Sequence, residues 1–199
     1  CWYTGDAASS LGLLAQRRVM IYEVRTYDLK PGTVPAAEEA FAVALPHREK
    51  YSPLAAFWHT EGGALNQIIH VWGYQDLEER DKIRGQASAD PNWPPKLREF
   101  ITNMNSEIWI PAPFMRPLGG DQELGNIYEM RTYTYEVGSI PELLRRWGDS
   151  MPYREELSPL AAGMYTELGD LNRWMHIWPY SDLAHRTEVR AASRQIEHW

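Results

Sequence analysis

The residues best suited to chemistry lie in two similar stretches of alternating side chains. Residues 66–74 read N-Q-I-I-H-V-W-G-Y, and residues 172–180 read N-R-W-M-H-I-W-P-Y. Asn, His and Trp keep the same even spacing in both, so each stretch presents them on one face of a predicted β-strand. An imidazole can transfer protons or ligate a metal or haem iron, and an indole can stack on a flat ligand. This face therefore has the composition of a ligand pocket.

A charged pair accompanies each stretch. Residues 21–27 read I-Y-E-V-R-T-Y, an alternation that places Glu23 and Arg25 on one face of another predicted strand. A guanidinium group there could hold a carboxylate or another anion. An alternative interpretation is that these polar groups only pair with each other, because buried charges need partners whether or not a ligand binds. The candidate pocket residues are Glu23, Arg25, Asn66, His70, Trp72, Glu129, Arg131, Asn172, His176 and Trp178, with no catalytic role assigned to any of them.

Turn and cap signals divide the surrounding chain into strands and helices. Pro31-Gly32 and Gly62-Gly63 predict turns, Thr33 is a candidate helix cap, and Asp76 to Glu79 forms a D-x-x-E capping box. The order is β-α-β-β-α-β, the ferredoxin-like pattern. The charged runs 48–50 and 78–82 are interpreted as solvent-exposed helix surface. The expected strands are 21–27, 54–61, 66–74 and 107–110, and the expected helices run from 33 towards 50, from 76 to about 88, and over 95–104.

The strand order expected for this pattern places the first strand between the third and the fourth. We expect the apolar face of these strands, which carries Tyr22, Val24, Ile69 and Val71, to lie under the helices. The polar face with Glu23, Arg25 and His70 would then line an internal cavity.

The same elements recur further along the chain. Ile21-Tyr22-Glu23 corresponds to Ile127-Tyr128-Glu129, a shift of 106 residues that needs no gap up to Trp93 and Trp199. The fold class is therefore α+β, with two tandem ferredoxin-like (βαββαβ) domains, the second lacking its last strand. The expected organisation is an extension over 1–19, a first domain over 20–118, a linker over 119–125 and a second domain over 126–199.

Composition excludes several classes of function. The formal net charge of -7 argues against nucleic acid as a partner, because binding to phosphates needs basic surface. No apolar run approaches the roughly 20 residues of a transmembrane helix. The single cysteine excludes an internal disulfide, and no sequence motif predicts a metal site. Nine tryptophans and eleven tyrosines are a high aromatic content, suited to a core or to a pocket for a flat ligand.

Several of these motifs together resemble the NIPSNAP family. They include I-Y-E-V-R-T-Y-D-L-K-P-G-T, L-N-Q-I-I-H-V-W-G-Y-Q-D-L, P-A-P-F-M-R-P-L and, in the second copy, L-N-R-W-M-H-I-W-P-Y-S-D-L. The resemblance implies a dimeric α/β-barrel fold in which two ferredoxin-like sheets face each other. It would place the second set of candidate residues opposite the first across one interior.

The resemblance implies little chemistry, because the family has no settled enzymatic activity. We expect a module that binds a small aromatic or anionic ligand or a protein, in a homo-oligomer. It implies a mitochondrial location for a eukaryotic source and a cytoplasmic one for a bacterial source. No cofactor is predicted. Related barrel families include cofactor-free and haem-dependent monooxygenases, so a small monooxygenase-like or isomerase-like enzyme is the alternative, with haem as its candidate cofactor.

Overall fold

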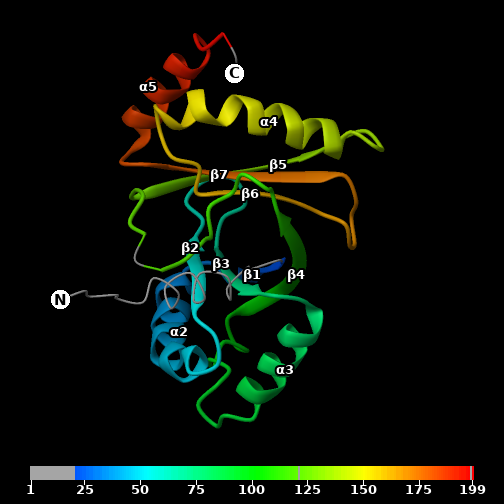
Figure 1. Ribbon diagram of the computed structural model, residues 1–199. Helices are drawn as coiled ribbons and strands as arrows, with labels where there is room; N and C mark the ends of the chain where they lie inside the picture. The colour runs from blue at the N-terminus through cyan, green and yellow to red at the C-terminus, as the bar shows by residue number, and fades with distance from the viewer. Residues whose placement is uncertain (1–20, 121, 198) are drawn as a thin grey trace, which may run out of the picture.

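The computed structural model describes residues 21–120, 122–197 and 199. The expected extension over 1–19 lies outside this range. Two halves share an order of elements, β-α-β-β-α-β followed by β-α-β-β-α (Figure 1). The elements are β1 (Ile21–Leu29), α2 (Val34–Glu49), β2 (Leu54–His59), β3 (Gln67–Tyr74), α3 (Leu77–Ser88), β4 (Ile101–Pro111), β5 (Ile127–Thr134), α4 (Ile140–Glu155), β6 (Ala162–Tyr165), β7 (Arg173–Tyr180) and α5 (Leu183–Ser193).

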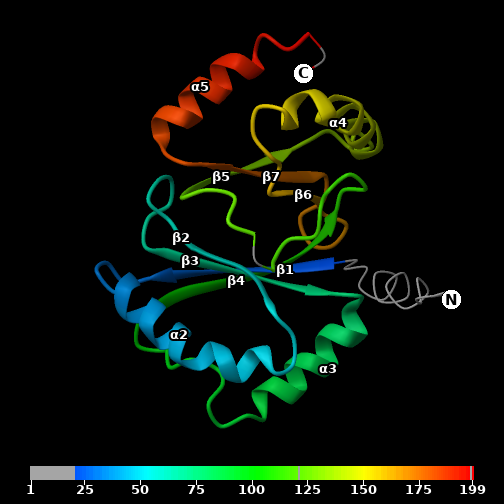
Figure 2. The ribbon, with the colours of Figure 1, turned by 60° about the vertical axis from the view of Figure 1, so that its left-hand side comes forward.

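The strands form one antiparallel sheet that folds over on itself. Their order is β2-β3-β1-β4-β6-β7-β5, so β1 lies between β3 and β4 as the sequence predicts. The two halves of the sheet are joined where Ile110 and Pro111 of β4 pair with Tyr165 and Met164 of β6. They then face each other, with α2 and α3 on one outer side and α4 and α5 on the other (Figure 2). The α+β barrel-type fold is confirmed.

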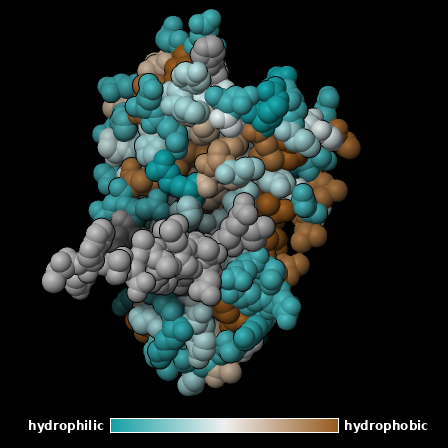
Figure 3. All heavy atoms as spheres, viewed as in Figure 1, coloured by the Kyte–Doolittle hydropathy of each residue, from teal (hydrophilic) through white to brown (hydrophobic). Residues whose placement is uncertain are grey.

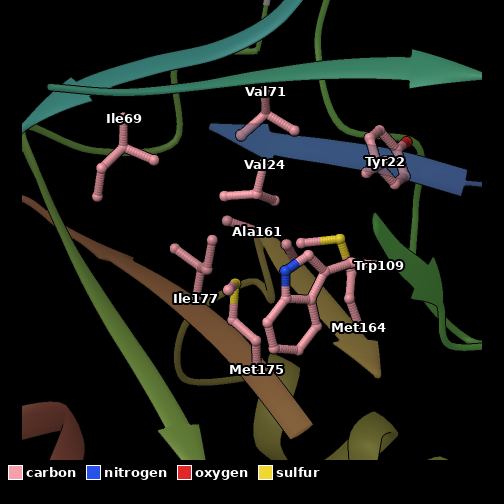
Figure 4. Close-up of a cluster of buried hydrophobic side chains, with 10 residues drawn as sticks. Tyr22, Val24, Ile69, Val71, Trp109, Ala161, Met164, Met175 and Ile177 are labelled. Atoms are coloured by element: carbon pink, nitrogen blue, oxygen red, sulfur yellow. The ribbon is translucent and has the colours of Figure 1, made fainter. Parts of the chain in front are cut away.

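The space between the two half-sheets is apolar. Tyr22 and Val24 of β1 and Val71 of β3 point towards Met164 and Ile177 of the second half (Figure 4). All five are at most 3% exposed. The expectation that Tyr22, Val24, Ile69 and Val71 lie under helices was therefore wrong. Alternation correctly separates the two faces of each strand, but it does not say which face meets a helix.

The opposite face of the first half-sheet packs against α2, α3 and the segment before β4. Its buried cluster joins Ile68, Trp72 and Tyr74 of β3 to Phe41 of α2 and to Leu97. The face with Glu23, Arg25 and His70 belongs to this layer, because their separations from Trp72 in the β1–β3 register keep them on the same side. The polar face thus lies under the helices rather than inside the barrel.

The prediction of a helix over 95–104 was also wrong. Residues 97–100 form only a turn, and β4 starts at Ile101, paired with Leu29 of β1. Thr102, Asn103 and Asn105 are poor helix formers. Pairing with the free side of β1 satisfies backbone groups that a single helical turn would leave open.

The predicted helix starts are only partly confirmed. The Asp76 carboxylate accepts a hydrogen bond from the Glu79 amide at 2.8 Å, and Asp182 does the same for His185 at α5. At α2, however, the Thr33 hydroxyl donates to the Lys30 carbonyl and caps nothing. Pro35 in the first turn instead removes one amide that would need a partner.

The outer helical layers are largely hydrophilic at the surface, while apolar side chains gather near the junction of the two halves (Figure 3). An ion pair between Arg173 of β7 and Glu107 of β4 crosses this junction, and the Arg173 guanidinium lies over the Trp109 ring at 4.9 Å. None of the helices in the described ranges is long and apolar enough to span a membrane.

Candidate functional site

A cavity of about 660 Å³ lies between the first half-sheet and its helical layer. It is bounded by β1, β3, α2, α3, residues 93–98 and the start of β4. Four arginines line it, and none of its described lining residues is acidic. The remaining walls are mostly aromatic and apolar. The lining residues used below are Arg25, Tyr27, Phe41, Arg48, His70, Trp72, Tyr74, Arg84, Trp93, Leu97 and Arg98.

Local periodicity brings these side chains together. His70 and Trp72 are two residues apart on β3, and Arg25 of β1 is the register partner of His70. On α2, Phe41 and Arg48 are seven residues apart and therefore share a helix face, and both are buried. The sheet thus supplies the floor of the cavity, and α2 supplies one wall.

A fully buried carboxylate lies beside the cavity. Glu23 accepts hydrogen bonds from Arg25 Nη1 at 2.7 Å, Arg80 Nη2 at 2.8 Å and Ser106 Oγ at 2.7 Å, and Arg84 Nη1 lies 3.4 Å away. Burial alone would raise the pKa of Glu23, but the bonds from Arg80, Ser106 and Arg25 lower it to about 2. Three arginines therefore share one carboxylate, and the cluster keeps a net positive charge.

Arg48 is a buried cation without a carboxylate partner. Its Nη1 donates to Ser52 Oγ at 2.8 Å, its Nη2 donates to the Tyr74 hydroxyl at 3.0 Å, and its guanidinium carbon lies 4.2 Å from the centre of the Trp72 ring. Within the described residues, no carboxylate oxygen lies within 4.0 Å of it. Burial lowers the pKa of Arg48, yet an arginine stays charged in proteins. The interpretation of 48–50 as exposed helix surface was wrong for Arg48, which is 3% exposed.

His70 presents a single hydrogen-bond donor. The Trp72 indole N–H, which can only donate, bonds to His70 Nδ1 at 2.7 Å. The ring proton of a neutral His70 must then be on Nε2, which is buried and has no partner in the described part of the chain. Burial and the nearby arginines Arg25, Arg84 and Arg48 lower the pKa of His70 to about 3, so the ring is neutral.

This tautomer does not fit the haem alternative. An axial iron ligand must offer an unprotonated ring nitrogen and usually donates its other N–H to an acceptor. At His70 the ring nitrogen next to Trp72 is the acceptor, and Nε2 carries the proton. His70 is also disfavoured as a general base, because Nδ1 already accepts from Trp72 and Nε2 carries the proton, so neither ring nitrogen has a free lone pair.

The two asparagines of the candidate set have a structural role in backbone turns. Asn66 and Asn172 both have φ of 57°, a left-handed conformation that asparagine tolerates better than most residues. Their carbonyls accept from the Leu29 and Tyr135 amides at 2.8 Å, which fixes the turn before β3 and its counterpart before β7. Asn66 does not line the cavity.

The second set of candidates forms a related cluster on the outer face of its own half-sheet. Glu129 accepts from Arg186 and from Arg190 at 2.9 Å, and His176 Nδ1 accepts from the Trp178 indole at 2.7 Å. The expectation that Glu129, Arg131, Asn172, His176 and Trp178 face the first set was wrong, because the interior between the half-sheets is the apolar cluster.

Larger side chains stand at the corresponding positions in the second half, where a separate hollow of about 630 Å³ is lined by Trp147, Trp199 and residues of α4. Trp147 and Trp174 stand where the first half has Phe41 and Ile68. Their ring centres are 5.0 Å apart, and Trp147 lies 4.8 Å from the His176 ring. The charged and imidazole groups are duplicated, but the packing around them is not.

The residues that sequence reasoning missed come from the helices. Arg48, Arg80, Arg84 and Phe41 contact the strand residues only after α2 and α3 dock. One signal could have found the arginines, since all three recur as Arg154, Arg186 and Arg190 in the second copy. Arginines repeated at fixed positions among otherwise variable helix residues indicate a shared internal partner.

The fold and this cluster define a barrel-type α/β protein with an arginine-rich cavity under its helices. The sequence model of the NIPSNAP family matches residues 22–116 and 128–199, so the chain belongs to the NIPSNAP family.

Curated relatives include Protein NipSnap of Drosophila melanogaster, 26% identical over 90% of this chain and 69% of its own length. Human Protein NipSnap homolog 3A is 29% identical over 90% of this chain and 73% of its own length. Among solved structures, a Fusobacterium nucleatum protein named "Putative monooxygenase" aligns over 88% of this chain and 82% of its own, with a TM-score of 0.60 and 13% identity. At that identity the likeness concerns the fold alone.

Proposed function

We propose that the first half of the chain binds a small organic anion with an apolar or aromatic body. The observation that carries this proposal is Arg48, a buried cation that borders a cavity and has no carboxylate partner in the described residues. A buried charge is costly unless it is paired, and an anionic ligand would supply the missing pair.

The charge and size of the cavity support the same conclusion. Arg25, Arg48, Arg84 and Arg98 line it, whereas the whole chain has a net charge of -7. The positive potential is thus local. A volume of about 660 Å³ lies within the range of roughly 300–1,000 Å³ typical of small-molecule sites. Phe41, Trp72 and Trp93 line the cavity and supply aromatic surface for the body of the ligand.

The proposal is tested with 8-anilinonaphthalene-1-sulfonate, an anionic aromatic probe, and its uncharged relative N-phenyl-1-naphthylamine. We expect the sulfonate to bind at one site and Arg48→Met to weaken its binding by about tenfold or more, because a charged hydrogen bond is lost. Fluorescence titration measures both. Arg154→Met is the matched control, since Arg154 is equally buried over Trp178 but lies in the tryptophan-filled half.

Two outcomes would contradict the proposal. In one, the uncharged probe binds as tightly as the sulfonate. In the other, Arg48→Met and Arg154→Met weaken binding equally, which would indicate general loosening of the fold. Thermal melts of both variants check that each is folded, and Arg48→Lys, which keeps the charge, should retain part of the affinity.

Binding is favoured over the enzymatic alternative by the state of the polar groups. His70 borders the cavity with an unpaired Nε2–H but no free lone pair, and the Glu23 carboxylate already accepts from three side chains. A general base needs an available lone pair and a pKa near the working pH. Neither group meets both conditions.

The proposal also covers the organisation of the chain into two similar units. Two units over 20–118 and 126–199, joined by 119–125, agree with the two matched segments and the repeated element order. Self-association is part of the proposal, and light scattering after size-exclusion chromatography tests it. The compartment, cytoplasmic or mitochondrial, stays a prediction that follows from the source.

A further inference from the structure

The unpartnered donor of His70 lies in an aromatic environment. The imidazole is 2% exposed, and its ring centre lies 4.9 Å from Tyr27 and 5.0 Å from Phe41. Nε2 has no hydrogen-bond partner in the described residues, although His70 borders the cavity. A buried N–H without an acceptor is destabilising. The position is therefore suited to an acceptor that arrives with the ligand.

Surrounding charges keep this donor neutral. The charged groups that face His70 are Arg25 and Glu23 of the neighbouring strand, Arg48 of α2 and Arg84 of α3. Arginines outnumber the single carboxylate and oppose a proton on the imidazole. The Trp72 N–H opposes the other tautomer, because two donors would then meet at Nδ1. His70 thus presents one fixed, uncharged donor.

An uncharged donor between aromatic rings is better matched to an uncharged oxygen than to an anion. A full negative charge placed against Phe41 and Tyr27 would lose its hydration, whereas the arginines offer charged donors elsewhere in the same cavity. The charged arginine donors and the uncharged His70 donor are therefore suited to different groups of one ligand, an anionic group and a neutral hydrogen-bond acceptor.

We propose that the ligand is an oxo acid, in which the arginines hold the acid group and His70 Nε2–H donates to a neutral carbonyl oxygen on an apolar or aromatic chain. This inference rests on the proposed function and narrows it to one class of compound. Trp93, whose ring lies 5.7 Å from Phe41 and 6.0 Å from Trp72, would cover the apolar chain.

The test compares acids that differ by one carbonyl group. The probes are 4-phenylbutyrate with 4-oxo-4-phenylbutyrate and 5-phenylvalerate with 5-oxo-5-phenylvalerate, so that two distances between the acid and the carbonyl are sampled. By isothermal titration calorimetry, we expect one oxo acid to bind about tenfold more tightly than its parent, as one added hydrogen bond allows.

His70→Phe should abolish this preference while the parent acid still binds through the arginines. His176→Phe, the matched change in the other half, should leave the preference intact. If His70→Phe does not fold, Trp72→Phe serves instead, because it frees His70 to adopt the other tautomer and should reduce the preference. Nitrogen-15 NMR measures the tautomer of the imidazole directly. It should show the Nε2–H tautomer in the unsubstituted protein.

The outcomes separate this inference from the function on which it rests. If all four acids bind but neither oxo acid is preferred, only the carbonyl inference fails. A preference that survives His70→Phe also overturns it. If none of the four binds and the sulfonate probe also fails to bind, the proposed anion site falls as well.

Discussion

The two buried histidines should make the protein sensitive to mild acid. Burial is the largest cause that lowers the pKa of His70 and His176, in each case to about 3, from an ordinary value of 6.5. As pH falls below about 6.5, the unfolded chain takes up a proton at each site and the folded chain does not. Stability is therefore lost as pH falls through this window.

We predict that the free energy of unfolding falls between about pH 6 and pH 5 by up to roughly 1.4 kcal/mol per pH unit for each buried histidine. Urea titrations over this range measure the slope, and His70→Phe should reduce it. His59 acts with the opposite sign, because Glu38, bonded to its Nδ1 at 2.7 Å, raises its pKa. The His59 contribution is already complete below about pH 6.5, so replacement of His59 should change stability mainly above that pH and leave the slope between pH 6 and pH 5 nearly unaltered. A slope unchanged by His70→Phe would contradict the buried neutral state.

Residue types and spacings predict part of the site. Alternation groups Glu23 and Arg25 on one face of β1 and His70 and Trp72 on one face of β3. Arg25, His70 and Trp72 line one cavity, and Glu23 is bonded to Arg25 beside it. The tautomer of His70 could not be predicted, because it depends on the rotamer that points the Trp72 N–H at Nδ1. The role of Asn66 was missed because a left-handed backbone conformation leaves only a weak trace in sequence.

Helix α3 and strand β1 are joined by the ion pairs around the Glu23 carboxylate. Arg80 and Arg84 are four residues apart on α3, and both reach the Glu23 carboxylate of β1. The helix is thereby fixed over the strand by charge as well as by apolar packing, which involves Ala87, its only buried residue within the described helix, and the partly buried Ile83.

We predict that Glu23→Gln lowers the free energy of unfolding by about 3 kcal/mol, the low end for a broken buried ion pair, because it leaves the partly buried guanidinium groups of Arg25 and Arg80 without a counter-charge. Chemical denaturation measures the loss. Glu129→Gln is the matched change, and its loss should be smaller because the Glu129 side chain is 19% exposed whereas that of Glu23 is 0% exposed. Equal losses would show that burial of Glu23 is not what makes the cluster strong.

Docking of the helices decides which face of the sheet they cover, the point on which the expectation from sequence was wrong. Each strand of the first half has apolar residues on both faces, so either face could have met the helices. Phe41 and Arg48 settle the matter, because an aromatic ring and a guanidinium on the buried face of α2 match the polar and aromatic side of β3. The error over 95–104 has a similar origin, since β4 is defined by its pairing with β1.

At the scale of the whole molecule, one apolar layer joins both halves. Val24 and Val71 of the first half and Met175 and Ile177 of the second belong to the same buried cluster (Figure 4). The Arg173–Glu107 ion pair and the β4–β6 pairing cross the same junction. We therefore expect the two halves to unfold together.

We predict that Ile177→Ala, at a side chain only 1% exposed, lowers the free energy of unfolding by about 2–5 kcal/mol. Hydrogen exchange followed by mass spectrometry should show faster exchange in β3 as well as β7. Val137→Ala, at a residue 92% exposed, is the control and should change neither. Faster exchange confined to β7 would mean that the halves unfold separately.

The unequal filling of the two helical layers has an evolutionary consequence. Phe41 and Trp147 occupy the same position of the repeat. Phe41 borders the arginine-lined cavity, whereas Trp147 packs against Trp174 and His176 and borders a separate hollow of about 630 Å³. Natural selection at Phe41 would act on ligand binding, whereas selection at Trp147 would act on the stability of the fold. Substitutions tolerated at one copy are then poor guides to the other, and a profile averaged over both repeats would hide the position that matters most for ligand choice.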